Sequence, residues 1–328
     1  MGAGAIGGFF AGLWSAAGLD VTLLGRARQI ADHADGVRVR DEAGWAAHGH
    51  PDFTADPRAL AGADLIVLAV KSTGTDAAAE EIAAHARPGT TVLSFQNGVS
   101  NAARLAAALP DMTILPGMVR FNVVPDGPAI WRKASDGQAF AQTDPILDPL
   151  TRAGANTPAP LAQVADMDPL VWGKLLLNLN NALNALSGLT LREELWQRPF
   201  RRVYAAALRE TLDLLEVANI RPAQVGAMPP RLMTAFLVMP DFIFRPVAAR
   251  VQKISPTART SMAEDFLQGR PSEIDYLNGE VVALANRYGR EATVNARIVE
   301  LVRDAEAGGR RDWPARDLAR AVLGRPRG

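Results

Sequence analysis

Short apolar runs alternate with amphipathic stretches in the first half of the chain. Residues 21–24, 65–70 and 91–95 are each rich in branched side chains and apolar without alternation. This pattern is typical of parallel strands that are buried on both faces. Residues 77–86 have helical periodicity and end before Pro88 and Gly89. The first half therefore predicts βαβ units and a doubly wound, parallel α/β sheet.

The second half reads as helical throughout. Helical periodicity covers residues 169–186, 201–218, 257–267, 272–288 and 293–307. Residues 222–256 are rich in Pro and Met, and we interpret them as a packed irregular connection, with a partner surface as the alternative. The chain of 328 residues is long enough for two cores. We expect a nucleotide-binding α/β domain over residues 1–164 and an all-α domain over residues 165–328.

A glycine motif opens the chain. Gly2, Gly4 and Gly7 match G-x-G-x-x-G, and a predicted helix over residues 7–17 and a strand follow at the right spacing. Such glycines allow a tight turn, close approach of a pyrophosphate and helix–strand packing, and the helix N-terminus favours the phosphates. A glycine turn without a ligand explains the order of the following elements less well. The motif predicts a Rossmann-type domain whose cofactor contacts include Gly2, Gly4, Ala5, Ile6 and Gly7.

The motif should follow a strand, yet it begins at residue 2. That strand is normally central in its sheet, and its neighbours would otherwise carry unpaired backbone groups. We therefore expect Met1 to be an internal residue of the natural chain. An in-frame apolar run of about five or six codons upstream would support this expectation, and its absence would contradict it.

The end of the second predicted strand indicates which nucleotide is bound. Recognition of the ribose 2′-hydroxyl of NAD uses an acidic residue about 20 residues after the glycines. Here the strand ends in Leu24-Gly25-Arg26-Ala27-Arg28. Because a guanidinium suits a 2′-phosphate, Arg26 favours NADP over NAD. We interpret Arg28 as a solvated charge.

One polar stripe marks the first helix of the second half. With Lys174 as zero on a helical wheel, Asn178 lies at about 40° and Asn181 at about −20°, opposite an arc of leucines. A buried lysine must be paired or have a lowered pKa, and either condition suits a proton donor to a carbonyl. An interhelical polar ladder or a snorkelling lysine is the alternative. Asn180 and Asn184 point away from this stripe, and we interpret them as structural.

A further acidic segment precedes the helical stretch at residues 272–288. Ser272 or the loop before it can cap that helix, and Glu273 then lies in its first turn. The sequence alone gives Glu273 only a favourable interaction with the helix dipole.

Composition excludes several classes of function. Lys and Arg together number 35, as do Asp and Glu, so there is no global basic field for nucleic acid or an anionic membrane. There are no cysteines, which excludes disulfides, zinc thiolate sites and cysteine nucleophiles. No apolar run approaches the ~20 residues of a membrane span, and the N-terminus does not resemble a signal peptide. We expect a cytoplasmic protein that is a monomer or a homodimer.

The four histidines all lie in the first half, outside the polar stripe. A His–Asp acid/base pair is therefore not expected, which argues against opine or 3-hydroxy acid dehydrogenases that rely on such a histidine or a differently placed lysine. His48 and His50 could pair on a metal, but no further ligand pattern lies nearby. We predict a surface loop there and no metal site.

Five motifs together resemble the ketopantoate reductase (2-dehydropantoate 2-reductase) family over nearly the whole chain. They are Gly-Ala-Gly-Ala-Ile-Gly-Gly from Gly2, Val70-Lys71-Ser72, Gln96-Asn97-Gly98-Val99, Trp172-Gly173-Lys174-Leu175 and Arg270-Pro-Ser-Glu273-Ile-Asp-Tyr-Leu-Asn-Gly279. The last is the most specific, and its distance from Ser261 also matches the family.

The resemblance implies NADPH along the glycine loop, with Arg26 on the 2′-phosphate and Lys71 nearby. It places Asn97 at the junction of nicotinamide and substrate. Lys174 would polarise the ketone of a small 2-oxo acid and protonate the alkoxide as hydride arrives at C2, which stabilises charge present only in the transition state. Asn178 would orient the substrate.

Two further roles follow from the same resemblance. Ser261 would hold the substrate carboxylate, and Glu273 would hydrogen-bond the substrate or Lys174. The family usually has a second substrate asparagine eight residues after the lysine, where this chain has Ala182. Neighbouring Asn181 lies closer to the lysine stripe and could take that role with altered geometry. The alternatives are a reductase of another 2-oxo acid and a catalytically silent NADP-binding sensor.

Overall fold

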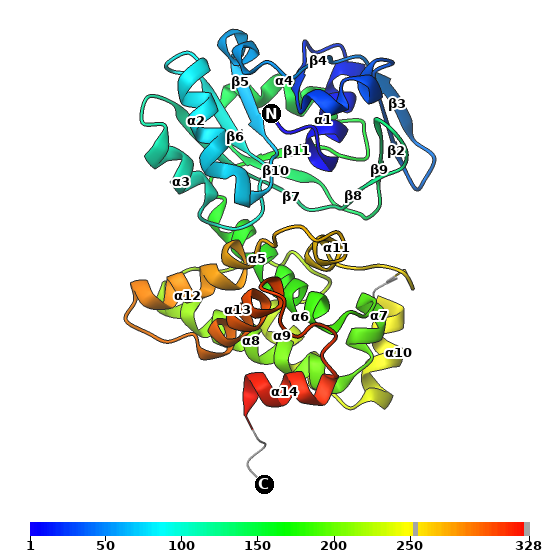
Figure 1. The fold of residues 1–328 in the computed structure, drawn as a ribbon, viewed down its shortest axis with the longest axis vertical. Helices are drawn as coiled ribbons and strands as arrows, with labels where there is room; N and C mark the ends of the chain where they lie inside the picture. Colours follow the sequence, from blue (N-terminus) through cyan, green and yellow to red (C-terminus); the bar gives the residue numbers. More distant parts are fainter. Residues whose placement is uncertain (252–254, 325–328) are drawn as a thin grey trace. The chain divides into compact units, whose positions relative to one another are not determined.

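The structure is a computed structural model that describes residues 1–251 and 255–324 (Figure 1). It divides into two compact units, Met1–Met167 and Asp168–Gly328. The division falls close to the predicted boundary at residue 164.

A five-stranded sheet forms the centre of the first unit. Its order is β11-β10-β7-β6-β5, with bounds Leu161–Val164, Ala139–Gln142, Thr113–Val119, Thr91–Ser94 and Leu65–Leu68. β5, β6 and β7 are parallel, as predicted for residues 65–70 and 91–95, whereas β10 runs antiparallel to β7. The sheet is parallel-rich rather than wholly parallel, so the predicted α/β class is confirmed and the purely parallel sheet is not.

Residues 1 and 2 lie between the ends of two strands. β1 (Thr22–Leu24) pairs in parallel with β4 (Asp52–Thr54). The amide of Gly2 donates to the carbonyl of Leu24 at 2.9 Å, and the carbonyl of Met1 accepts from the amide of Ala69, just beyond β5, at 2.9 Å. The glycine loop is therefore fixed by backbone hydrogen bonds to the carboxyl ends of both strands.

Four helices belong to this unit: α1 (Ala5–Ala16), α2 (Thr75–His85), α3 (Asn101–Ala108) and α4 (Asp148–Gly154). α1 is buried along most of its length and places Phe9, Phe10 and Leu13 in the core. Because a Cβ at Gly12 would lie 2.7 Å from a methyl group of Val37, the helix approaches the second sheet closely only through glycine.

That second sheet has four strands in the order β3-β2-β9-β8. Their bounds are Ala46–Gly49, Val37–Asp41, Ile130–Lys133 and Val123–Pro125. In β2, valines face inward and arginines outward, which is the alternation of a strand with one solvated face. Short 3-10 turns also occur in the first unit, at Ala27–Gln29, Ala31–His33, Pro57–Gly62, Ser72–Gly74 and Pro145–Leu147. Another lies at Ile274–Tyr276 in the second unit.

The regular structure in the described part of the second unit is all helical, as predicted, with turns and irregular segments between the helices. Its helices are α5 (Asp168–Asn178), α6 (Asn180–Ser187), α7 (Leu191–Leu195), α8 (Arg198–Val217), α9 (Pro230–Leu237), α10 (Asp241–Val251), α11 (Ser261–Leu267), α12 (Asn278–Arg287), α13 (Thr293–Glu306) and α14 (Ala315–Leu323). None of the described helices is both long and apolar enough to cross a membrane.

The interpretation of residues 222–256 as irregular is wrong where α9 and α10 form. Proline is compatible with the first turn of α9, where its missing amide hydrogen costs nothing. The fully buried Arg201 of α8 donates to the carbonyls of Leu237 and Met239 and pairs with Asp241 at 2.8 Å, so it fixes the junction of the two helices. Residues 252–254 lie outside the described residues.

The predicted single helix over residues 169–186 is interrupted at Leu179, between α5 and α6. The hydroxyl of Tyr204 lies 3.2 Å from the carbonyl oxygen of Leu176 and 3.3 Å from that of Leu177. A side chain inserted among these carbonyls is a recognised cause of a helix break. Leu179 keeps right-handed helical dihedrals (φ −58°, ψ −25°), and its amide donates to the carbonyl of Leu175 at 3.0 Å, so the wheel angles of Asn178 and Asn181 stay predictions.

Candidate active site

The glycine loop has the geometry of a phosphate cradle. Gly2 has φ of +103°, and a Cβ there would lie 2.9 Å from the carbonyl carbon of Ala69. A Cβ at Gly7 would collide with the carbonyl oxygen of Gly2. At Gly4, by contrast, a Cβ would meet no atom within 4 Å. The first and third glycines are thus required by the protein itself, whereas the second borders open space.

The start of α1 adds donors to this cradle. Gly4 is the N-cap residue, no side chain caps the helix, and its first turn carries no acidic residue. The amides at the beginning of a helix have no intrahelical acceptors and favour an anion. Ala5, Ile6 and Gly7 form this first turn. The loop therefore fits the diphosphate of a dinucleotide.

Arg26 lies just beyond β1, and its side chain is exposed. Its backbone amide donates to Gln29 Oε1 at 3.0 Å, while Gln29 Nε2 donates to the carbonyl of Ala3 at 2.9 Å. Gln29, which the sequence reasoning missed, thereby joins the Arg26 turn to the glycine loop. The Arg26 guanidinium makes no hydrogen bond or ion pair with the described residues.

Lys71 and Asn97 follow the adjacent parallel strands β5 and β6. Ser72 Oγ donates to the carbonyl of Asn97 at 2.9 Å, and Asn101 Nδ2 also donates to that carbonyl. Lys71 is exposed, and Asn97 is partly buried. The two motifs around these residues meet because the carboxyl ends of parallel strands share one edge of the sheet.

A buried polar network below Asn97 escaped the sequence reasoning. Gln96 Nε2 donates to Thr75 Oγ1 at 2.8 Å, and Asn101 Nδ2 lies 3.1 Å from Ser72 Oγ. Thr75 and Asn101 are almost wholly buried. Thr75 and Asn101 are the first residues of α2 and α3, where polar residues usually act as caps, so their types alone did not indicate this network.

Lys174 and Glu273 interact within the second unit. Lys174 lies on the partly buried face of α5, and Glu273 is buried at the start of the turn Ile274–Tyr276. Burial lowers the pKa of Lys174 to about 8, and the negative charge of Glu273 opposes this shift. An amine with this pKa can both donate and accept a proton near neutral pH.

The turn that carries Glu273 is fixed by two side chains. The amide of Ser272 donates to Glu306 Oε1 of α13 at 2.7 Å, and Ser272 Oγ accepts from the amide of Ile274 at 3.3 Å. The sequence predicted a helix beginning at Ser272, but α12 begins only at Asn278. Glu273 therefore lies in a separate turn and not in the first turn of a helix.

Ser261 and Asn181 come from neighbouring elements. Ser261 is exposed in the first turn of α11, whose N-cap residue is Thr260. Thr260 Oγ1 donates to the carbonyl of Asn181 at 3.3 Å. Asn181 is buried, and Asn178 at the end of α5 is partly buried. The predicted helix over residues 257–267 begins four residues later than expected, at Ser261.

Position 173, next to Lys174, requires a glycine because another segment of the chain packs closely against it. The segment after α8 crosses α5 here, and the amide of Ala223 donates to the carbonyl of Pro169 at 2.7 Å. A Cβ at Gly173 would collide with the carbonyl oxygen of Ala223. The Trp172-Gly173-Lys174 motif is thus partly a packing requirement.

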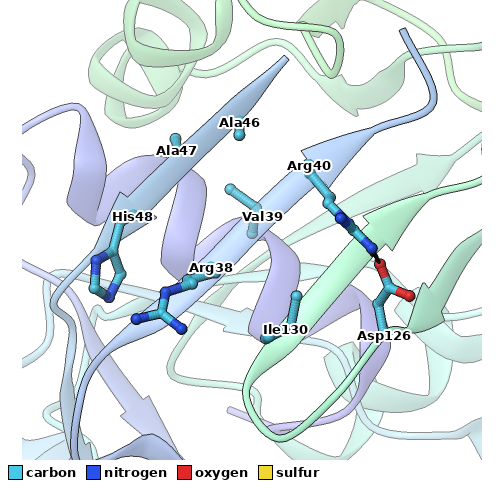
Figure 2. A pocket seen from close by; sticks show the side chains of 8 residues that line it. All are labelled: Arg38, Val39, Arg40, Ala46, Ala47, His48, Asp126 and Ile130. Atoms are coloured by element: carbon cyan, nitrogen blue, oxygen red, sulfur yellow. Dashed lines mark hydrogen bonds and ion pairs between the residues drawn. The ribbon is translucent and has the colours of Figure 1, made fainter. Parts of the chain in front are cut away.

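A surface cavity of about 410 Å³ lies elsewhere, on the outer face of the β3-β2-β9-β8 sheet (Figure 2). Arg40 pairs with Asp126 across it, and Arg38 and His48 line its other end. None of its lining side chains belongs to the predicted site. No group of three or more His, Cys, Asp or Glu side chains in the described part of the chain could hold a metal ion. The chemistry therefore points to the two clusters above and not to this cavity.

Comparison with known proteins assigns the chain to a family. Residues 1–143 match the sequence model of ketopantoate reductase PanE/ApbA, and residues 166–306 match that of its C-terminal region. The 2-dehydropantoate 2-reductase of Halobacterium salinarum is 28% identical over 320 residues, covering 94% of this chain and 98% of the relative. That of Mycobacterium tuberculosis H37Rv is 26% identical over 312 residues, covering 94% and 97%.

Solved structures agree. A PanE/ApbA family ketopantoate reductase from Ralstonia eutropha JMP134 has a TM-score of 0.79 at 27% identity and covers 94% of this chain and 97% of its own. D-mandelate dehydrogenase in complex with NADH and anilino(oxo)acetate has a TM-score of 0.75 at 19% identity, with the same coverage, and shows the fold alone. The chain belongs to the ketopantoate reductase family of NAD(P)-dependent oxidoreductases.

Proposed function

We propose that this protein reduces 2-dehydropantoate (ketopantoate) to pantoate with NADPH, and that Lys174 is the proton donor. The observation that carries the proposal is that Lys174 of α5 interacts with the buried carboxyl group of Glu273, in a chain of the ketopantoate reductase family. The pKa of Lys174 is lowered to about 8 by burial, while Glu273 keeps the protonated form accessible. A general acid works best when its pKa lies near the working pH.

Each predicted residue has a defined part in this proposal. The bound nucleotide would supply a hydride to C2 of the ketone. The Nζ of Lys174 hydrogen-bonds the ketone oxygen and gives it a proton as negative charge develops there. The exposed hydroxyl of Ser261 suits the substrate carboxylate, and Asn178 suits a polar group next to the lysine. Asn97 would orient the reacting groups, and Glu273 holds Lys174.

Arg26 supports NADPH as the preferred nucleotide. Its exposed guanidinium follows β1 and has no acidic partner, and a 2′-phosphate would supply one. Gly2, Gly4 and the first turn of α1 would hold the diphosphate. Lys71, exposed after β5, adds a cation two residues beyond Ala69, whose amide bonds the carbonyl of Met1 next to the glycine loop.

A second candidate is the reduction of another 2-oxo acid. Ala182 is fully buried where an asparagine is usual, and neighbouring Asn181 is buried with its carbonyl bonded to Thr260. The loss of one amide donor would change how the distal part of a substrate is held. A substrate with a different substituent at C3 would then be favoured.

The test is NADPH oxidation, followed by absorbance, with ketopantoate and a panel of branched 2-oxo acids. We expect turnover of ketopantoate with NADPH and much slower turnover with NADH. Turnover of another 2-oxo acid alone would favour the second candidate. Tight NADPH binding without turnover of any 2-oxo acid would contradict both and favour a silent NADP-binding sensor.

A further inference from the structure

Glu194 of α7 is a fully buried carboxyl group that the proposed reaction does not use. Its Oε2 accepts from Asn180 Nδ2 of α6 at 3.2 Å. Asn184, one turn further along α6, is also fully buried and lies beside it. A buried ionisable group is costly unless it is paired or neutral, so its retention here requires an explanation.

Two buried acceptors in this cluster lack a donor. Glu194 Oε1 and Asn180 Oδ1 both have no hydrogen-bond partner among the described residues. Two buried hydrogen-bond acceptors without a donor are energetically unfavourable in the low-dielectric interior of a protein. A protonated carboxyl group supplies the missing donor. Burial raises the pKa of Glu194 to about 8, and the amides of Asn184 and Asn180 only partly oppose this.

Few charges face the carboxyl from the surrounding elements. α6 has no ionisable side chain. On α8, Tyr204 is buried and has a raised pKa, for which burial is the main cause and the nearby Glu194 a smaller one. Arg201 contacts α7 through the carbonyl of Leu195 but is paired with Asp241. On α5, Lys174 interacts with Glu273. Arg259, just before α11, donates to the carbonyls of Gly188 and Leu189 at 2.9 Å and acts on the neighbouring Glu193. Among the described residues, no cation contributes to the pKa of Glu194.

The cluster connects the elements that carry the proposed substrate residues. Asn184 Oδ1 accepts from the amide of Thr260 at 3.0 Å, and Asn184 Nδ2 donates to the carbonyl of Leu189 at 3.1 Å. Thr260 in turn caps α11, in which Ser261 is the first residue, and bonds the carbonyl of Asn181. Hydrogen bonds therefore run from the residues beside Glu194 to the base of Ser261.

We propose that Glu194, held as a neutral acid, is a positioning residue that fixes the start of α6 against α11 and so sets the placement of Ser261 relative to Lys174. The inference rests on the proposed 2-oxo acid reduction. Glu194 acts through Asn180, Asn184 and Thr260, and does not itself contact substrate in this scheme. A shift of about 1 Å in a substrate-binding group can cost about 100-fold in rate.

The experiment compares Glu194→Gln with Glu194→Ala. Glutamine carries one acceptor and one donor, as a neutral acid does, so we expect its kcat/KM within about threefold of the parent. Alanine removes both, and we expect kcat/KM for the 2-oxo acid to fall about 100-fold. The Kd for NADPH should stay within about twofold, because the glycine loop belongs to the other unit. Parental kcat/KM in Glu194→Ala, or equal damage in both variants, would overturn the proposal.

Two further measurements separate this inference from the proposed function. Infrared difference spectra at pH 7 should show the carbonyl stretch of a protonated carboxyl group that Glu194→Gln abolishes. Absence of that band would refute a neutral Glu194, whether or not the protein reduces any 2-oxo acid. If Glu194→Ala does not fold, Thr260→Val tests the same connection, since it removes the Thr260–Asn181 bond. A raised KM for the 2-oxo acid is expected, and an unchanged KM would contradict the scheme.

Discussion

At the scale of the residue, burial makes Lys174 a stronger acid than a lysine in water. Desolvation disfavours the ammonium form and lowers the pKa to about 8, while Glu273 stabilises that form. The two effects oppose each other, and their balance leaves a group that is mostly protonated at neutral pH. Such a group can protonate an alkoxide without being a permanent, unreactive cation.

The first prediction concerns the pH dependence of catalysis. The kcat/KM for 2-oxo acid reduction should fall as pH rises through about 8, because the lysine must carry its proton. The kcat/KM for oxidation of the hydroxy acid should rise over the same range, because the lysine must then accept a proton. Glu273→Gln removes the charge that raises the lysine pKa, so both midpoints should move to lower pH. Midpoints that do not respond to this substitution would assign the titration to another group.

The second prediction concerns Arg26. Arg26→Ala should raise the KM for NADPH by about 10-fold to 100-fold through the loss of a charge-assisted contact, and should leave the KM for NADH nearly unchanged. Arg28→Ala is the matched control, because Arg28 is also exposed and lies two positions further on. Equal effects of the two substitutions would indicate a general electrostatic contribution instead of a specific contact.

At the scale of the element, the sequence predicted the helices and strands whose own residues form a strong periodic pattern. The strands at residues 65–68 and 91–94 and the helices α1, α8 and α13 have strong periodicity and were found. β2, with exposed arginines on one face, and β9, which ends in Arg132 and a buried Lys133, were missed. The break at Leu179 could not be read locally, because Tyr204, which contacts the carbonyls there, lies on another helix.

The third prediction separates two glycines of one loop. In Gly4→Ala the added methyl meets no protein atom, so stability should stay within about 0.5 kcal/mol while NADPH binding weakens by at least about 10-fold. In Gly7→Ala the methyl collides with Gly2, and the free energy of unfolding should fall by about 1–3 kcal/mol. Urea unfolding and NADPH fluorescence titration measure the two effects. Full NADPH affinity in Gly4→Ala would place the diphosphate elsewhere.

At the scale of the whole molecule, the two units carry different parts of the proposed chemistry. The first holds the glycine loop, Arg26 and the Asn97 network, and the second holds Lys174, Glu273 and Ser261. Local sequence patterns indicated the glycine loop and Lys174 as candidate site residues, but they gave Glu273 only an interaction with a helix dipole. Residues 174 and 273 are far apart in the sequence, so no periodic pattern could indicate that they interact. Only the resemblance to the family suggested this pairing. Their interaction in the structure is consistent with that pairing.

In the proposed reaction, Lys174 transfers the proton during hydride transfer to a 2-oxo acid. The most direct measurement is the single-turnover rate of NADPH oxidation with saturating ketopantoate, in the parent protein and in Lys174→Ala. We expect the rate to fall by about 10²-fold to 10⁴-fold in the variant, with circular dichroism and the NADPH Kd unchanged. A Lys174→Ala protein that oxidises NADPH at the parental rate would contradict the role of Lys174 as the proton donor.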